Sequence, residues 1–317
     1  MTTIAGVARV TVLGAGTIGA SWCALFLAKG LDVVAYDVGP DCERALLAFV
    51  EAAWPLLGEL GFAPDASISR LRYRSDLSAA CAGTDFVQEC APERADLKVA
   101  LLETVDGLIR PDVLIASSSS ALTVSEMQTR CRHPERVVLG HPFNPPHIMP
   151  LVEVAGGAKT APEALDRATR FYEALGKSPI RLNKEVYGHV ANRIQAAVFR
   201  EAIHLLASGV ASLVDIDKAI TDGPGLRWAL MGPFLTYHLG GGVGGMAAFM
   251  QQFAPVQQKL WAELGSPALD ETLQAEVIEA MRREAGGRAM ADLVHRRDES
   301  LVALLKSRSD AAAERDD

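Results

Sequence analysis

Gly14-Ala15-Gly16-Thr17-Ile18-Gly19 decides the fold expected for this chain, because of what lies on either side of it. Residues 7–13, just before it, are apolar and rich in β-branched side chains, which is typical of a buried strand. The residues after it carry apolar side chains at helical spacing until Gly30, and glycine often ends helices. A strand, a turn with the spacing GxGxxG and a helix, in that order, predict a Rossmann-type dinucleotide site.

Each glycine of this turn has a separate expected task. Gly14 permits the tight turn, Gly16 lets the backbone approach a pyrophosphate, and Gly19 allows the helix and strand to pack closely. The N–H groups at the start of the helix, around Thr17 and Ile18, are expected to bind the phosphates.

Asp37 ends the next apolar stretch, residues 31–37, and lies 18 residues beyond Gly19, close to the spacing of about 20 that the motif requires. At this spacing a carboxylate accepts hydrogen bonds from the adenosine ribose hydroxyls and repels a 2′-phosphate. The expected cofactor is therefore NAD rather than NADP. A solvated strand end is the alternative interpretation of Asp37, and the spacing disfavours it.

Strands and helices alternate as far as residue 182, and helices alone follow. The predicted fold class is α/β: an N-terminal Rossmann-type parallel-sheet domain over residues 1–186, then an all-helical C-terminal domain over residues 187–317. The first domain has further expected strands at 71–73, 85–90, 113–116, 137–140, 151–154 and 179–182; the second has expected helices at about 188–207, 212–222 and 226–239.

Composition narrows the class of protein. The chain has 317 residues, 49% of them apolar and 22% charged, which suits a soluble protein of two domains. A net charge of −8 disfavours nucleic acid as a partner. No leader and no stretch of about 18 apolar residues is apparent, so no membrane partner is expected. Five cysteines without CxxC spacing favour a reducing, cytoplasmic setting, and no cluster has metal-ligand spacing.

A candidate base follows the expected strand at residues 137–140. Histidine is the natural base for a hydroxyl proton at neutral pH, and His141 begins the sequence His-Pro-Phe-Asn-Pro. Glu153 lies in the next expected strand, where its carboxylate would orient the imidazole and stabilise the imidazolium. A loop histidine and an edge-strand acid are the alternatives, and their joint occurrence beside a Rossmann turn disfavours both.

Polar side chains also follow other expected strands. Ser117–Ser120 come directly after residues 113–116, and in an open parallel sheet such positions face the ligand crevice. Ser120 could bind a substrate hydroxyl, although the serine run could equally be turn-forming. Asn192 lies on an amphipathic helix, where an isolated asparagine is usually a surface residue. Four histidines have no evident partner and are interpreted as structural: His147, His189, His204 and His238.

These motifs together resemble the 3-hydroxyacyl-CoA dehydrogenase superfamily over nearly the whole chain. The H-x-F-N-P, V-E-V and N-R motifs of that family fall on His141, Glu153 and Asn192, and its catalytic serine falls on Ser120. The resemblance implies NAD-dependent oxidation of an L-3-hydroxy group, with these four residues catalytic, and a helical C-terminal domain that forms a homodimer. It also implies that three more residues lie by the cofactor: Glu93, Lys98 and, at the nicotinamide, Asn144.

The chain departs from the fatty acyl-CoA branch of this superfamily in three places. That branch usually has asparagine in place of Ser118 and Pro-Gly in place of Tyr187-Gly188. Residues 223–238 instead resemble the branch that acts on small free hydroxy acids, the L-carnitine and L-gulonate 3-dehydrogenases, the latter close to lens λ-crystallin. Residues 240–253 are more similar to the carnitine enzymes. The resemblance therefore disfavours a long acyl-CoA.

The residue types in this region agree in part with carnitine as the substrate. A quaternary ammonium cannot donate a hydrogen bond and is best held against aromatic faces, while a carboxylate favours a guanidinium. A polyol acid would need several amides and hydroxyls, which are few here. The aromatic residues could equally be core of the helical domain. The candidate substrate-binding residues are Arg193 or Arg227 for the carboxylate and Trp228, Phe234, Tyr237, Phe249 and Phe253 for the ammonium.

The expected function is thus NAD-dependent oxidation of L-carnitine to 3-dehydrocarnitine. L-Gulonate, or another short-chain L-3-hydroxy acid or 3-hydroxyacyl-CoA, is the alternative substrate. A non-catalytic, NAD-binding structural protein is the alternative of another class, and the presence of both His141 and Glu153 disfavours it.

Overall fold

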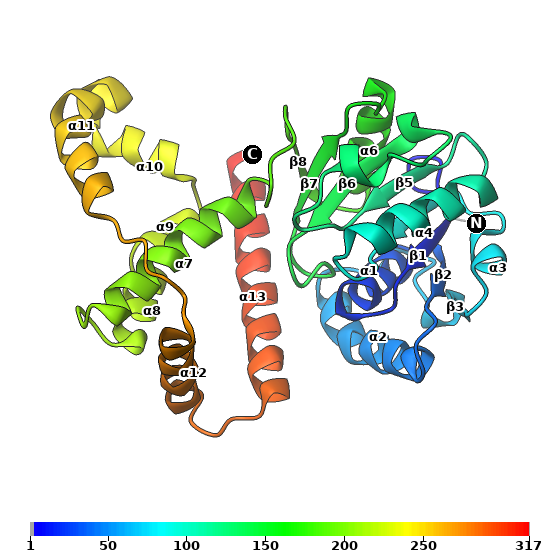
Figure 1. Ribbon diagram of the computed structural model, residues 1–317, viewed down its shortest axis with the longest axis horizontal. Coiled ribbons are helices and arrows are strands. Elements are labelled where there is room, and N and C mark those ends of the chain that lie inside the picture. Colours follow the sequence, from blue (N-terminus) through cyan, green and yellow to red (C-terminus); the bar gives the residue numbers. More distant parts are fainter. Residues whose placement is uncertain (1–2, 317) are drawn as a thin grey trace. The chain divides into compact units, whose positions relative to one another are not determined.

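The computed structural model describes residues 3–316, the last eight of them in backbone only, as two compact units (Figure 1). The first unit runs to Asn192 and also includes Arg296–Asp310. The second unit holds Arg193–His295 and the end of the chain from Ala311. The change from strands to helices is expected near residue 186; the compact units divide after Asn192, and the first takes back part of the last helix.

The first unit contains one eight-stranded sheet with the order β3-β2-β1-β4-β5-β6-β7-β8. Neighbouring strands are parallel except β6 and β7, which are antiparallel. The predicted α/β class with a Rossmann-type sheet is therefore confirmed, apart from that one pair. The strands are β1 (Arg9–Leu13), β2 (Asp32–Tyr36), β3 (Leu71–Arg74), β4 (Phe86–Glu89), β5 (Leu114–Ser117), β6 (Val137–Pro142), β7 (Leu151–Gly156) and β8 (Ser178–Arg181).

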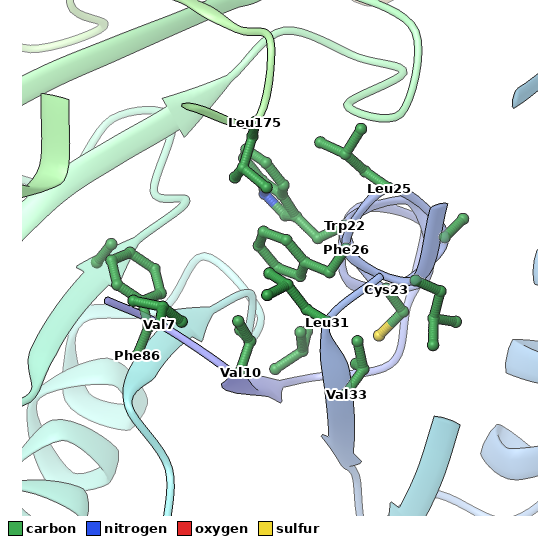
Figure 2. Close-up of a cluster of buried hydrophobic side chains, with 14 of the residues drawn as sticks. Val7, Val10, Trp22, Cys23, Leu25, Phe26, Leu31, Val33, Phe86 and Leu175 are labelled. Carbon is green, nitrogen blue, oxygen red and sulfur yellow. The ribbon is translucent and has the colours of Figure 1, made fainter. Parts of the chain in front are cut away.

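Apolar side chains cover the sheet on both faces, as a mostly parallel sheet requires. One core joins the sheet to α1 (Thr17–Ala28), α2 (Cys42–Glu59) and α6 (Pro162–Ala174), and the other joins it to α4 (Ala95–Leu108) and α5 (Val124–Met127). Figure 2 shows Trp22 and Phe26 of α1 in the first core. Their rings stack, with centroids 5.2 Å apart. Two short helical segments, η1 (Ile68–Arg70) and α3 (Leu77–Cys81), flank β3, and a third, η2 (Pro134–Arg136), precedes β6.

The second unit is helical, as predicted. Its described helices include α8 (Leu213–Thr221), α9 (Pro224–Trp228), α10 (Pro233–Gly240), η3 (Gly242–Gly244), α11 (Gly245–Glu263) and α12 (Glu271–Ala285). Two others, α7 (Ala191–Ala207) and α13 (Met290–Asp316), have residues in both units. No helix in the described part of the chain is both long and apolar enough to span a membrane.

The prediction of a single helix at residues 226–239 is wrong. The structure has two helices there, α9 and α10, with residues 229–232 between them. Pro233 is the first residue of α10, a position where proline loses no helical hydrogen bond, whereas inside a helix it would clash with the preceding turn.

Candidate active site

The pairing of β6 with β7 brings His141 and Glu153 together. The antiparallel register places the two residues directly opposite each other, so their side chains lie on the same face of the sheet. His141 Nδ1 lies 2.7 Å from Glu153 Oε2, and both side chains are buried. A histidine at the end of a strand is thus held by a carboxylate from the neighbouring strand.

The second carboxylate oxygen of Glu153 is also bonded. Oε1 accepts hydrogen bonds from the backbone N–H groups of Val190, at 2.8 Å, and Ala191, at 3.0 Å, at the start of α7. Burial alone would raise the pKa of Glu153, but the hydrogen bonds from His141 and these two N–H groups outweigh burial and lower it. An ionised Glu153 can only accept, so Nδ1 of His141 carries a proton and Nε2 offers a lone pair to a substrate.

Gly140 leaves space for a buried polar network behind His141. A Cβ at Gly140 would lie 2.0 Å from the hydroxyl of Tyr172, so no larger residue fits there. Tyr172 donates to Gln88 Oε1 at 2.7 Å. Gln88 Nε2 donates to Ser118 Oγ at 2.8 Å and to the Gly140 carbonyl at 3.3 Å. Ser118, one of the departures from the acyl-CoA branch, is therefore part of the support for β6.

Glu93 holds the serine run in place. Its Oε1 accepts from Ser119 Oγ at 2.6 Å and from the N–H groups of Ser120 and Ala121 at 3.0 and 2.9 Å. Burial tends to raise the pKa of Glu93, but the hydrogen bond from Ser119 and the charge of Lys98 lower it overall. A charged carboxylate thus fixes the loop that carries Ser120. Ser120 itself is exposed.

Asn192 joins the same loop from the start of α7. Its Nδ2 donates to the Ser120 carbonyl at 3.3 Å. The structure therefore brings the four predicted catalytic residues together as two bonded pairs, His141 with Glu153 and Ser120 with Asn192, linked through residues 189–192.

Lys98 lies beneath the surface of the crevice rather than on it. Its ammonium donates to Glu89 Oε1 and Oε2, at 2.7 and 3.0 Å, and to the Ala91 carbonyl at 2.9 Å. Its side chain is 1% exposed and lies 3.5 Å from a carboxylate oxygen of Glu93. Sequence reasoning missed Glu89, although an acid closing an apolar strand was a usable signal.

His189 also has a different place from the one expected. The sequence indicated no partner for it, whereas the structure gives it two. Its ring centroid lies 5.1 Å from that of His141, and its Nε2 lies 3.0 Å from the Ser119 carbonyl. It is buried, and the burial lowers its pKa. No pattern in the sequence pointed to this contact, which depends on where α7 begins in space.

The glycine-rich turn has the geometry of a dinucleotide site. Gly14 has a φ of 97°, and a Cβ there would lie 2.6 Å from the Cys90 carbonyl. A Cβ at Gly19 would lie 1.8 Å from the Gly14 carbonyl. Around Gly16, which is exposed and precedes α1, nothing lies within 4 Å of a Cβ position. This open approach to the N–H groups of Thr17 and Ile18 fits a pyrophosphate.

Asp37 closes the other end of that site. Its Oδ2 accepts from the Ala15 N–H at 2.8 Å, and its Oδ1 accepts from Val38 and Gly39 at 2.7 and 3.0 Å. Burial would raise the pKa of Asp37, but these N–H donors lower it. Val38 and Gly39, the two residues after Asp37, line a cavity of about 700 Å³ together with Tyr73 and others. This volume is large enough for an adenosine. The residues present fit NAD.

The predicted substrate residues other than Arg193 lie on three helices of the second unit. Arg227 and Trp228 end α9, Phe234 and Tyr237 lie in α10, and Phe249 and Phe253 lie in α11. The Tyr237 and Phe249 rings stack 4.7 Å apart, and Phe253 is 5.0 Å from Phe249. Phe249 is buried while Trp228, Phe234 and Tyr237 are exposed. Arg193, in α7, is exposed, as is Asn144 in the loop after β6 of the first unit.

Comparisons with known proteins identify the family of the chain. Residues 9–186 match the model of the 3-hydroxyacyl-CoA dehydrogenase NAD binding domain, and residues 188–266 match that of the 3-hydroxyacyl-CoA dehydrogenase C-terminal domain. An L-carnitine dehydrogenase of Streptomyces coelicolor is 49% identical over 100% of this chain and 99% of the relative. One of Pseudomonas aeruginosa is 47% identical over 96% of this chain and 95% of the relative.

A solved structure is similar over almost the same length. It is an NAD+-dependent dismutase, 5-formyl-3-hydroxy-2-methylpyridine 4-carboxylic acid 5-dehydrogenase, with 29% identity and a TM-score of 0.83. The match covers 96% of this chain and 99% of that one.

Proposed function

The chain belongs to the 3-hydroxyacyl-CoA dehydrogenase family, and from that membership we propose that it oxidises the 3-hydroxyl of L-carnitine to 3-dehydrocarnitine. It is an NAD-dependent dehydrogenase that acts on a CH–OH group, and the predicted family and cofactor are confirmed. The observation that carries the substrate is the similarity of the whole chain to L-carnitine dehydrogenases, 43 to 49% identical over at least 93% of its length.

The buried pair of His141 and Glu153 supports the chemistry of this reaction. NAD, when bound, supplies the hydride acceptor. The lone pair on Nε2 of His141 takes the proton of the 3-hydroxyl, while Nδ1–H stays bonded to Glu153. The resulting imidazolium is stabilised by a carboxylate that the N–H groups of Val190 and Ala191 already hold in place.

The other predicted site residues keep their proposed tasks. Ser120 and Asn192, joined through the Ser120 carbonyl, hold the substrate oxygen. The cofactor is held by the turn residues Gly14, Gly16, Thr17, Ile18 and Gly19, by Asp37, and by Glu93 and Asn144. Lys98 acts through Glu93 and Glu89, because its ammonium is buried against these carboxylates.

The trimethylammonium group of carnitine is proposed to lie against aromatic faces of the helical unit. Tyr237 and Phe253 pack on the buried ring of Phe249, and Trp228 and Phe234 are exposed nearby in sequence. A cation over such faces gains about 0.5–2 kcal/mol without needing a hydrogen-bond acceptor. Arg193 or Arg227 would bind the carboxylate.

As part of the same proposal, residues 1–186 form the NAD-binding domain and residues 187–317 the substrate-binding and dimerisation domain of a cytoplasmic homodimer. The helical unit exposes large apolar side chains, among them Phe199, Leu230 and Trp261, which a second copy of the chain would cover. Light scattering after size-exclusion chromatography measures the mass; a monomer at micromolar concentration contradicts the dimer.

A substrate panel tests the proposed reaction. Purified protein with NAD is given L-carnitine, L-gulonate, 3-hydroxybutyrate or a 3-hydroxyacyl-CoA, and NADH formation is followed by absorbance. The highest kcat/KM is expected with L-carnitine. A higher value with gulonate would move the assignment to the alternative substrate. Turnover of none of them would favour the non-catalytic alternative.

A further inference from the structure

A single tetrapeptide, His189-Val190-Ala191-Asn192, contacts every part of the catalytic arrangement. The N–H groups of Val190 and Ala191 donate to Glu153, and the Asn192 side chain donates to the Ser120 carbonyl. His189 lies between these two halves, with its ring against His141 and its Nε2 on the Ser119 carbonyl. It therefore contacts both the base and the loop Ser117–Ser120, here called the serine loop.

The backbone of His189 is strained, and its side chain is enclosed. Its φ is 52°, in the left-handed region that costs a residue other than glycine about 1 kcal/mol or more. Its side chain is buried, with 3% of the residue exposed. A residue remains in such a conformation only when the surrounding contacts hold it there, and the contacts here are catalytic residues.

The protonation state of His189 follows from these neighbours. A carbonyl oxygen can only accept, so the 3.0 Å contact with Ser119 requires a proton on Nε2. Burial lowers the pKa of His189, the bond to Ser119 opposes this, and the neighbouring His141 lowers the pKa further whenever its ring is protonated. Glu153 and Glu93 face it and raise the pKa, without reversing the direction. A neutral His189 does not compete with His141 for the negative charge of Glu153.

We propose that His189 is a positioning residue, which holds the His141 ring on Glu153 through ring contact and fixes the serine loop through its Nε2–H. Its two contacts have separable effects. The ring contact governs how well the base is aligned, and alignment is expressed in kcat. The hydrogen bond governs where Ser120 lies, and Ser120 binds the substrate oxygen. This inference rests on the proposed role of His141 as the base.

Two substitutions separate the contacts. His189→Gly removes the ring and is compatible with positive φ, so we expect a normal melting temperature and a kcat lowered about 10- to 100-fold, as for a misaligned base. His189→Phe keeps a ring but has no N–H. We expect its kcat within about threefold of the original and a hydroxy-acid KM raised about tenfold, because one buried carbonyl loses its donor. His133→Phe, at an exposed histidine of the same unit, is the matched control.

Two further measurements show whether any loss comes from this positioning. Neither substitution should change NADH affinity, measured by fluorescence titration, more than about twofold, because the hydrogen bond and the ring contact of His189 go to Ser119 and His141, which are not predicted cofactor residues. Nitrogen-15 NMR of the histidine rings is expected to show His189 as the neutral Nε2–H tautomer at pH 7, a result that does not depend on activity.

Wild-type kcat and KM in both variants would overturn the inference, and so would a charged or Nδ1–H form of His189 at pH 7. If His189→Gly fails to fold, the KM of His189→Phe still decides. A His141→Ala variant separates this inference from the reaction itself. If His141→Ala turns over normally, the proposed base is wrong; if it is inactive while the His189 variants are unaffected, only the role of His189 fails.

Discussion

Glu153 lies directly opposite His141 across the antiparallel pair β6 and β7, with Oε2 2.7 Å from Nδ1. A one-residue slip in this register would turn the carboxylate to the other face of the sheet. The same kind of pair, a histidine Nδ1 and a glutamate carboxylate oxygen, occurs in an exposed form elsewhere in the chain, where His133 Nδ1 lies 3.2 Å from Glu135 Oε1. Only the buried pair also receives N–H donors from the start of α7, so the two pairs are suited to a controlled comparison.

Replacing Glu153 by Gln removes the charge and leaves the shape. Glutamine can present an N–H to Nδ1 and so favour the wrong tautomer of His141; we expect kcat to fall by about 10²–10⁴-fold with NAD affinity kept. Steady-state rates and NADH fluorescence titration measure the two effects. Glu135→Gln, at the exposed pair, should leave kcat unchanged. A Glu153→Gln variant with more than a tenth of the original kcat would contradict this role.

Substitution by alanine at two glycines of the Rossmann turn should change two different quantities, stability at Gly19 and NAD affinity at Gly16. Gly19→Ala places a methyl group 1.8 Å from the Gly14 carbonyl, so we expect the free energy of unfolding to fall by about 1–3 kcal/mol or more. Gly16→Ala meets nothing within 4 Å, so stability should be unchanged while NAD affinity falls at least tenfold. Urea unfolding and NADH titration measure the two quantities. Equal effects of both substitutions on stability would refute the assignment.

Asp37→Asn tests the preference for NAD. The substitution removes a charge that would repel a 2′-phosphate, and leaves an oxygen that can accept from Ala15. We expect the ratio of kcat/KM for NAD to that for NADP to fall at least tenfold, with kcat for NAD within a few-fold of the original. Asp32→Asn is the control, at an acid in β2 that pairs instead with Arg70 of η1. An unchanged ratio would remove Asp37 from cofactor selection.

Acidification should destabilise the first unit through His147. Burial lowers the pKa of His147 from 6.5 to about 4, and the charges of Lys177 and Arg297 act in the same direction. Between these two pH values the unfolded chain binds a proton that the folded chain excludes, so stability falls as the pH falls from about 6.5 to about 4.

His147→Gln removes this titration, and the melting temperature should then depend less steeply on pH in that window. His133→Gln, at an exposed histidine, should leave the slope unchanged. If the slope is the same in all three proteins, His147 is not the titrating group.

The sequence by itself determined the Rossmann turn, its cofactor and the family, because these depend on residues that are contiguous in the chain. A strand, a glycine turn and a helix are local structures, and the need for glycine at Gly14 and Gly19 follows from backbone sterics. At Gly16 glycine instead leaves room for the pyrophosphate. His141 and Glu153 were also within reach, since two successive strands commonly pair.

Only the tertiary structure decided which other side chains meet them. His189 is 48 positions from His141 in the chain, and no periodicity relates the start of α7 to the end of β6. The ammonium of Lys98 lies away from the crevice because it donates to the buried carboxylate of Glu89, which belongs to another element. Such contacts depend on where separate elements pack, and the chain order carries little information about that packing. The physical reason is that burial and side-chain pairing depend on how distant segments pack in three dimensions, whereas secondary-structure propensity and turn geometry depend on residues adjacent in the sequence.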